Sequence, residues 1–292
     1  EEAVNKIKNV DLDCNFGSYT DISHIFHMQN ADLSKLELDI SNGSVSVEVW
    51  DEVDVRVECE VRVYQVDNKD QARKRFLSES VFSVENDLCQ LLVPSRQIKV
   101  KTNINIPQKM YEKISIRLFN GQIGINSAQM GKLFVKTNNG TVQLEQLTGT
   151  HAQAESTNGS IKAEQVTFKT FDAETINGSI RTTGEFEKVE TQVVTGSIHC
   201  NWDGEQATTG FFKTATGSIR LALPQDKRID GMLTTNIGSI HCGLEDYYTF
   251  DEQKDMVKKV LHFEANREME SLLHIEAETK TGSIWVLPNK TY

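Results

Sequence analysis

The sequence lacks long hydrophobic runs. No apolar stretch approaches the roughly 18–20 residues of a membrane-spanning helix, and no positively charged segment followed by an apolar run opens the chain, so we expect neither a spanning helix nor a signal peptide. Positive charge is also scarce. The formal net charge of −11 argues against a general nucleic-acid binder, because phosphate contacts need a surplus of Lys and Arg.

Catalytic signatures are missing as well. The chain has no GxSxG, HExxH, Walker-type loop or dinucleotide-binding fingerprint. The acidic residues are scattered, without the repeated Asp and Arg or Lys clusters expected of a β-helix enzyme that cleaves acidic polysaccharides. We therefore expect no catalytic residue, no metal site and no cofactor.

Cysteines are few, and they are far apart in the sequence: Cys14, Cys59, Cys89, Cys200 and Cys242. Their odd number, the absence of a CxxC pair and the length of the chain predict isolated buried thiols.

Cys200 and Cys242 hold the same position in a repeat, with Leu221 between them. Stacked two rungs apart they would lie about 9–10 Å from each other, whereas a disulfide needs Cα atoms within about 7 Å. If these cysteines point inward, His199 and His241 point outward, so a shared zinc site is not expected either.

Glycine recurs at a regular spacing, which is the strongest signal in the chain. Gly121, Gly140, Gly159, Gly178, Gly196, Gly217 and Gly238 follow one another at intervals of 19, 19, 19, 18, 21 and 21 residues. Gly282 comes 44 residues later, about two periods, and Gly43 lies 78 residues before Gly121, close to four. Most of these glycines belong to a Thr-Gly-Ser-Ile-like or Asn-Gly-Ser-Ile-like motif.

The residues around each glycine alternate between apolar and polar. A β-branched residue comes two positions after each glycine from Gly140 onward, and Thr or Ser recurs three positions before it in nearly every repeat. Alternation of period two indicates strands with one buried face, and the glycine supplies the turn between two strands. Propeller repeats are longer, about 40–50 residues. The predicted fold is therefore all-β: a single-stranded parallel β-helix or solenoid with rungs of about twenty residues and structural corner turns at Gly140, Gly159, Gly178, Gly196, Gly217, Gly238 and Gly282.

Two segments interrupt the period, and a third precedes it. Residues 1–30 are expected to be a leader and N-terminal cap, and residues 31–292 the solenoid domain. Within the solenoid, residues 68–80 predict a helical insertion with Asn68 as its N-cap. Residues 245–270 predict a hairpin insertion, in which VLHFEANREMESLLHIEAE forms two strands around a polar turn.

Four corners match the N-glycosylation pattern, at Asn42, Asn139, Asn158 and Asn177. The same asparagines sit at the turn of successive rungs, where stacked amides can hydrogen-bond as a ladder. We favour the ladder.

The third residue after each glycine forms an outward column: Gln143, Lys162, Arg181, His199, Arg220, His241 and Trp285. Like charges at rung spacing repel, so such a column costs stability unless it is compensated. Glu145 and Glu164, two residues further along, are one source of compensation. The alternative is a candidate anion-binding stripe for lipid headgroups, teichoic acid or another polyanion, composed of Lys162, Arg181, His199, Arg220 and His241.

The corner motifs TNGSI, INGSI, VTGSI and ATGSI, together with LELDISNGSVSVEVWDEVDVRVEC and EKISIRLFNGQI, resemble the bacterial adhesin-like β-solenoid family of LiaX/YvlB-type envelope-stress proteins. The resemblance covers the chain from about Asp21 onward. It implies residence at the cell surface of Gram-positive bacteria and a role in the response to cationic antimicrobial peptides and membrane-targeting antibiotics such as daptomycin. In LiaX-type proteins the solenoid is thought to restrain a three-component signalling system (LiaFSR). No catalytic residues carry over.

Three functions follow as hypotheses. The first is a non-catalytic regulatory module that binds a membrane-associated signalling protein or a cationic antimicrobial peptide. The second is an adhesin-like surface protein that binds anionic lipid or wall polymer. The third is a polysaccharide-active β-helix enzyme. The oligomeric state and the ligand stay open at this point.

Overall fold

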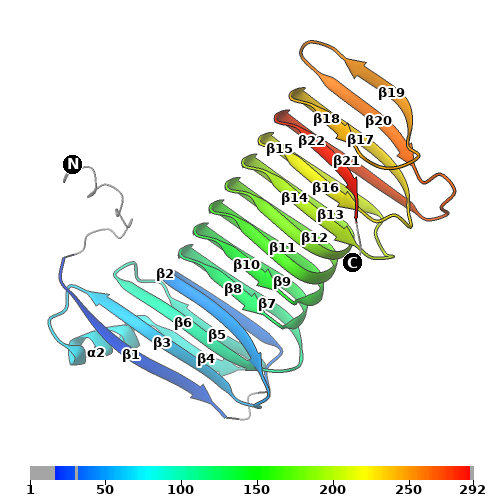
Figure 1. Ribbon diagram of the computed structural model, residues 1–292. Helices are drawn as coiled ribbons and strands as arrows, with labels where there is room; N and C mark the ends of the chain where they lie inside the picture. Colours follow the sequence, from blue (N-terminus) through cyan, green and yellow to red (C-terminus); the bar gives the residue numbers. More distant parts are fainter. Residues whose placement is uncertain (1–16, 30–31, 290–292) are drawn as a thin grey trace.

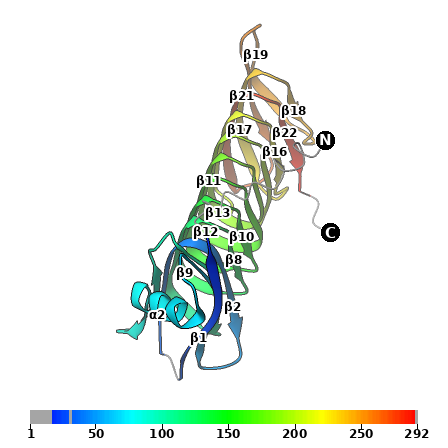
Figure 2. The same ribbon diagram turned by 90° about the vertical axis from the view of Figure 1, so that its left-hand side faces the viewer.

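The computed structural model describes residues 17–29 and 32–289, which form an elongated stack of strands with one short helix at its N-terminal end (Figures 1 and 2). The prediction of an all-β chain with a short helical insertion is confirmed. Most of the expected leader, residues 1–30, and Cys14 lie outside the described residues.

Each rung consists of a strand before the corner glycine and a strand after it, so the stack has two layers. The pre-corner layer contains, in spatial order, β4 (Val81–Glu85), β5 (Leu88–Val93), the first part of β2 (Lys35–Trp50), β7 (Met110–Asn120), β9 (Gln129–Asn139), β11 (Thr148–Asn158), the second parts of β12 (Ile161–Asn177) and β13 (Ile180–Thr195), β15 (Thr209–Thr216), β21 (Leu272–Thr281), β17 (Arg228–Ile237), β20 (Lys259–Ala265) and β19 (Tyr248–Lys254).

The post-corner layer contains, in spatial order, β1 (Tyr19–Met28), β3 (Val55–Tyr64), β6 (Ile98–Pro107), the second part of β2, β8 (Ile123–Asn126), β10 (Val142–Glu145), the first parts of β12 and β13, β14 (Ile198–Asp203), β16 (Ile219–Leu223), β22 (Ile284–Pro288) and β18 (Ile240–Cys242). From β2 through β22 neighbouring rungs pair in parallel, and antiparallel pairs occur only among the described strands at the two ends of the stack.

Parallel, in-register stacking places each inward side chain on its equivalent in the next rung. The column two residues after the glycine is buried at Val142, Ile161, Ile180, Ile198, Ile219 and Ile284. Burial of such apolar columns is the main favourable contribution to the fold, and no rung can bury its inner face alone.

The corners are held by two sets of side-chain hydrogen bonds. A buried hydroxyl three residues before the glycine donates to the corner carbonyl of the adjacent rung, as Thr175 Oγ1 does to Gly159 O at 2.7 Å. Outside the corner, the amide of each asparagine donates to the next one down the stack at 2.7–2.9 Å, from Asn177 through Asn158, Asn139 and Asn120 to Asn42. The predicted asparagine ladder is confirmed.

The rung order differs from the chain order at the N-terminal end. The rung of Gly43 lies directly against that of Gly121, because β2 pairs with both β7 and β8. The expectation of about four periods between these glycines is therefore wrong. Much of the intervening chain turns outward instead: β5 and β6 form the next rung beyond β2, and β3 and β4 continue each layer in the antiparallel sense.

The N-terminal end of the core is closed by helix α2 (Lys69–Glu79), whose first turn is capped by Asn68 Oδ1 accepting from the amide of Gln71 at 2.9 Å. The helix buries Ala72 and Phe76, and the Phe76 ring lies 6.1 Å from that of Phe26 on β1. An apolar helix face thus covers the open end of the stack, as a repeat protein requires.

The C-terminal end also departs from chain order. The rung of Gly282 lies between those of Gly217 and Gly238, since β21 pairs with β15 on one side and β17 on the other. The hairpin of the 245–270 interval is formed by β19 and β20. The expected pairing of the two strands in VLHFEANREMESLLHIEAE is wrong: they correspond to β20 and β21, which flank β17 from opposite sides.

A polar network ties the three strands of this end together. Asp230 on β17 accepts from His262 on β20 and from His274 on β21, each at 2.9 Å, and His274 also contacts Glu276 at 3.0 Å. Burial lowers the pKa of His274, but its hydrogen bonds to Glu276 and Asp230 outweigh burial and leave the pKa raised. Burial raises the pKa of Asp230, but its two histidine partners outweigh burial and leave that pKa lowered.

We expect this network to make stability depend on pH. A raised pKa of His274 stabilises the folded chain below the unfolded value of about 6.5, and the contribution is lost as pH rises through the folded pKa. Denaturant unfolding of the protein and of His274→Gln should therefore differ more at about pH 5.5 than at about pH 8.5. An equal difference at both pH values would show that the histidine is neutral in the network.

Candidate functional site

The five candidate stripe residues project from the outer face of the post-corner layer. Lys162, Arg181, His199 and Arg220 lie on four consecutive rungs in direct register. His241 does not follow Arg220. Because the rung of Gly282 intervenes, Trp285 lies between them, which corrects the column order expected from the sequence.

The tryptophan joins the column through its ring. The Arg220 guanidinium lies over the Trp285 ring at 5.5 Å from its centroid, and the His241 ring stacks on the other side at 5.4 Å with an interplanar angle of 14°. A cation over an indole face is attracted by the ring quadrupole. The cationic column is therefore defined here as Lys162, Arg181, His199, Arg220, Trp285 and His241.

The charges of the column are only partly compensated. Lys162 Nζ lies 3.0 Å from Glu164 Oε1, one of the two acids named from the sequence. In the part of the chain that the structure describes, no carboxylate pairs with Arg181 or Arg220. Burial lowers the pKa of His199, and the positive charges of Arg181 and Arg220 lower it further. His199 thus lies between two positive charges in the middle of the column.

A column of serines runs beside the cations and was not foreseen, although the Gly-Ser motif marks it in the sequence. Ser160, Ser179 and Ser197 follow their corner glycines, and each hydroxyl oxygen accepts the amide N–H of the next serine at 3.1–3.3 Å. Since the oxygen serves as acceptor, the hydroxyl hydrogen can be donated to a ligand. The surface therefore combines neutral donors with cations, which suits oxyanions.

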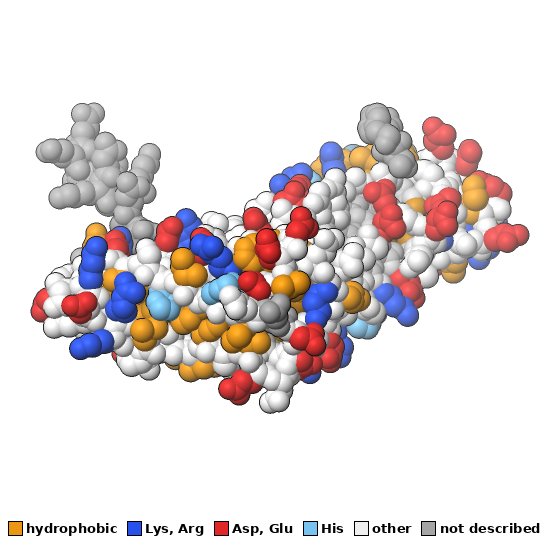
Figure 3. Space-filling view, turned by 90° about the horizontal axis from the view of Figure 1, so that it is seen from below, with side chains coloured by type: hydrophobic (Ala, Val, Ile, Leu, Met, Phe, Trp, Pro, Cys, Tyr) orange, Lys and Arg blue, Asp and Glu red, His pale blue; other side chains and the backbone are white. Residues whose placement is uncertain are grey.

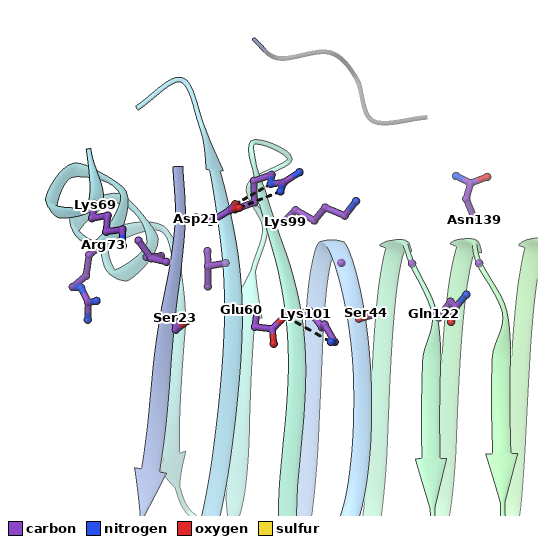
Figure 4. A pocket seen from close by; sticks show the side chains of 16 residues that line it. Asp21, Ser23, Ser44, Glu60, Lys69, Arg73, Lys99, Lys101, Gln122 and Asn139 are labelled. Carbon is purple, nitrogen blue, oxygen red and sulfur yellow. Dashed lines mark hydrogen bonds and ion pairs between the residues drawn. The ribbon is translucent and has the colours of Figure 1, made fainter. Parts of the chain in front are cut away.

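A groove of about 1080 Å³ lies at the N-terminal end of the same face, between α2 and the first corners (Figure 4). This N-terminal groove is lined by five basic side chains, Arg62, Lys69, Arg73, Lys99 and Lys101, against two acidic ones, Asp21 and Glu60.

Lys99 and Lys101 alternate with apolar residues in the sequence of β6, which puts both lysines on the outer face. Their meeting with residues of α2 and β3 could not be anticipated, because it depends on the out-of-order rungs at this end.

Within the groove, Arg62 and Lys101 take part in ion pairs. Arg62 donates from Nε and Nη2 to the two carboxylate oxygens of Asp21 at 2.9 and 3.1 Å, and the hydrogen bond and charge of Arg62 lower the pKa of Asp21 despite some burial. Lys101 Nζ lies 3.6 Å from Glu60 Oε2, and both side chains are well exposed. Ion pairs of that kind contribute little to stability, so Lys101 can exchange its partner for a ligand.

The pre-corner layer carries a contrasting acidic patch, defined by Glu155, Asp172, Glu174 and Glu190. Burial and the neighbouring Glu190 raise the pKa of Asp172. Figure 3 shows a further gathering of Asp and Glu side chains over the end of the molecule at which β19 and β20 lie. Acidic side chains thus gather at two places outside the cationic column and the groove.

The thiols lie in the core. Cys59, Cys89 and Cys200 are buried and unpaired, and Cys242 is partly buried and unpaired. Burial raises the pKa of both Cys59 and Cys89 to about 12, so neither is a reactive thiolate. Cys200 and Cys242 stand three rungs apart, not two, with Leu221 and Val286 between them.

Among residues 17–29 and 32–289, no three His, Cys, Asp or Glu side chains are grouped so that they could hold a metal ion. None of the helices formed by these residues has the length and hydropathy needed to cross a bilayer.

The sequence and the fold have counterparts in known proteins. Residues 33–284 match the Toastrack DUF4097 family. The chain belongs to this family. This Toastrack chain is 37% identical over 284 residues to the uncharacterized protein YvlB of Bacillus subtilis (strain 168), covering 97% of its own length and 78% of the relative.

Among solved structures, a protein of Parabacteroides distasonis ATCC 8503 named as a putative adhesin has a TM-score of 0.51 at 11% identity and covers 93% of the Toastrack chain and 98% of its own. A protein of Parabacteroides merdae ATCC 43184 bearing the same name has a TM-score of 0.41 at 9% identity, with 91% and 96% coverage. At 11% identity, the similarity to the Parabacteroides distasonis structure supports the fold alone.

Proposed function

We propose that this Toastrack chain is a non-catalytic β-solenoid recognition module of the bacterial cell envelope, and that its cationic column binds an anionic polymer or lipid surface. The observation that carries the proposal is the register of Lys162, Arg181, His199 and Arg220 on consecutive rungs. Rungs are about 4.8 Å apart, so like charges repel along the column. An anionic ligand removes that repulsion and pairs with Arg181 and Arg220.

The cell-envelope location is supported by the adhesin name of the Parabacteroides distasonis neighbour and by the resemblance to envelope-stress proteins. In the same proposal, occupancy of the column regulates a membrane-associated stress-signalling partner in a Gram-positive bacterium. A polysaccharide-active enzyme, the third hypothesis from the sequence, is not favoured because the sequence carries no catalytic motif.

A second candidate function rests on the acidic patch. Asp172 has a raised pKa because burial and Glu190 disfavour its charge, and a cationic peptide placed there would relieve that repulsion. This supports binding of a cationic antimicrobial peptide on the pre-corner layer. A peptide titration of the chain and of Asp172→Asn/Glu190→Gln should separate it from the first candidate, since those changes leave the cationic column untouched.

The test of the first candidate is sedimentation with vesicles of neutral and anionic lipid, and titration with a soluble polyanion, at low and moderate salt. The chain should bind the anionic ligands in a salt-sensitive manner. Lys162→Ser/Arg181→Ser/Arg220→Ser should bind roughly tenfold more weakly or worse, since the loss of about 1.4 kcal/mol of binding free energy is a factor of ten.

A matched variant controls for net charge. Lys113→Ser/Lys132→Ser/Lys213→Ser removes the same charge from exposed positions of the pre-corner layer and should bind as the parent does. Circular dichroism checks that both variants fold. If the column variant binds as tightly as the control, the column is not the binding surface.

A further inference from the structure

We infer that the ligand of the cationic column is a linear polyanion which also fills the N-terminal groove, so that one chain lies along the corner edge from the groove onto the column. The inference rests on the proposed function of the column and adds the shape and length of the ligand. The groove itself has no counterpart in the sequence pattern, and it is not required for binding at the column alone.

The groove and the column are continuous along the corner edge. The lining of the groove extends to Asn139 and Gly140 at the corner, and Lys162 projects from the very next rung. In the outward column between them stand Gly124 and Gln143, neither of which carries a negative charge. A ligand that leaves the groove therefore meets amide and hydroxyl donors and then cations, without crossing a carboxylate in that column.

The groove carries more basic than acidic side chains. Five basic groups face two acidic ones in a chain whose net charge is −11. Lys69 and Arg73, on successive turns of α2, form no ion pair with any other residue that the structure describes. In Figure 4 they flank β1 on the side opposite the corners, while Lys101 and Gln122 lie on the corner side. Cations thus border the groove on both sides, which suits a ligand with anionic groups on both of its edges.

The track formed by the groove and the column is longer than a small anion. From Arg62 on β3 to Arg220 on β16 the post-corner layer has eight strand-to-strand steps. At about 4.8 Å a step, the track is roughly 38 Å long. A chain longer than this can engage the groove and the column at once, and the second contact then becomes intramolecular with a high effective concentration. A lipid headgroup or a free phosphate can occupy one site but cannot bridge both.

The experiment is calorimetric titration of the whole chain with inorganic polyphosphate of defined length, shorter and longer than about 38 Å. Long chains should bind at least about tenfold more tightly than short ones at equal phosphate concentration, because they occupy both sites. Lys69→Gln/Arg73→Gln/Lys101→Gln should lower the affinity for long chains to that for short ones. Lys113→Gln/Lys132→Gln/Lys213→Gln, with the same charge change, should keep the length dependence.

The outcomes separate the inference from the proposed function. If the groove variant keeps the length dependence while the column variant loses binding, the track is wrong and the proposed function stands. If the column variant binds as the parent does, the proposed function fails and the track with it. If polyphosphate of every length fails to bind but anionic vesicles do, the ligand is a lipid surface and the inference is overturned.

Discussion

Replacing Gly121 with alanine should destabilise the stack by about 3 kcal/mol or more, a size reserved for a few mechanisms such as backbone strain and steric overlap. A Cβ at this position would lie 1.4 Å from the carbonyl oxygen of Gly43 and 2.6 Å from its carbonyl carbon. The backbone there has a φ of +139°, which a residue with a Cβ rarely adopts. Denaturant unfolding measures the loss.

The backbone cannot easily move away, because the corners stack on both sides. A Cβ on Gly43 would itself meet Val100, and one on Gly140 would meet Gly121. A backbone shift that relieves the overlap at one corner therefore creates an overlap at the next corner of the stack.

Gly124 provides the matched control three residues further on. A Cβ there has only Val45 O nearby, at 4.0 Å, and the glycine sits in strand β8 facing outward. Gly124→Ala should leave stability unchanged or raise it by up to about 1 kcal/mol, since glycine in a strand costs conformational entropy. Equal stability of the two variants would mean that close approach at the corner does not constrain the fold.

A disulfide between Ser218→Cys and Ser283→Cys should form and stabilise the chain by up to about 4 kcal/mol, through closure of a loop of some 65 residues. The two serines lie on adjacent rungs, with the amide of Ser283 donating to Ser218 Oγ at 3.3 Å. Adjacent strands are about 4.8 Å apart, within the Cα range that a disulfide accepts. Denaturant unfolding with and without reductant measures the gain.

The control pair is Ser218→Cys with Ser239→Cys, which are neighbours in chain order but lie two rungs apart in space. Ser283 stands between them, because the amide of Ser239 donates to Ser283 Oγ at 3.0 Å. About 9–10 Å is too far for a disulfide, so this pair should stay reduced. A crosslink in the control pair, and none in the first pair, would show that the rungs stack in chain order, as periodicity alone suggests.

Much of the molecule follows from the sequence because it depends on one repeat and its neighbour. The 19-residue spacing of Gly121, Gly140 and Gly159 puts equivalent residues in register whatever the rest of the chain does. The strands, the buried columns, the asparagine ladder and the alignment of Lys162, Arg181, His199 and Arg220 all follow from that register. The anion-binding role of the column is still a prediction.

The tertiary structure decided which rung lies next to which. The rungs of Gly217, Gly238 and Gly282 carry the same corner motif, so their edges are interchangeable and local pairing cannot rank them. The long segments between them set the order. β20 pairs with the outer edge of β17 and β19 pairs with β20, whereas β21 pairs with the inner edge of β17.

That choice placed Trp285 between Arg220 and His241, and the corresponding choice at the other end brought α2 beside Lys99 and Lys101 to form the N-terminal groove. Contacts of this kind join segments of the chain whose proximity the repeat spacing does not predict. The sequence by itself therefore determined the rung and the repeating face, while only the tertiary structure determined the ends of the stack and the groove.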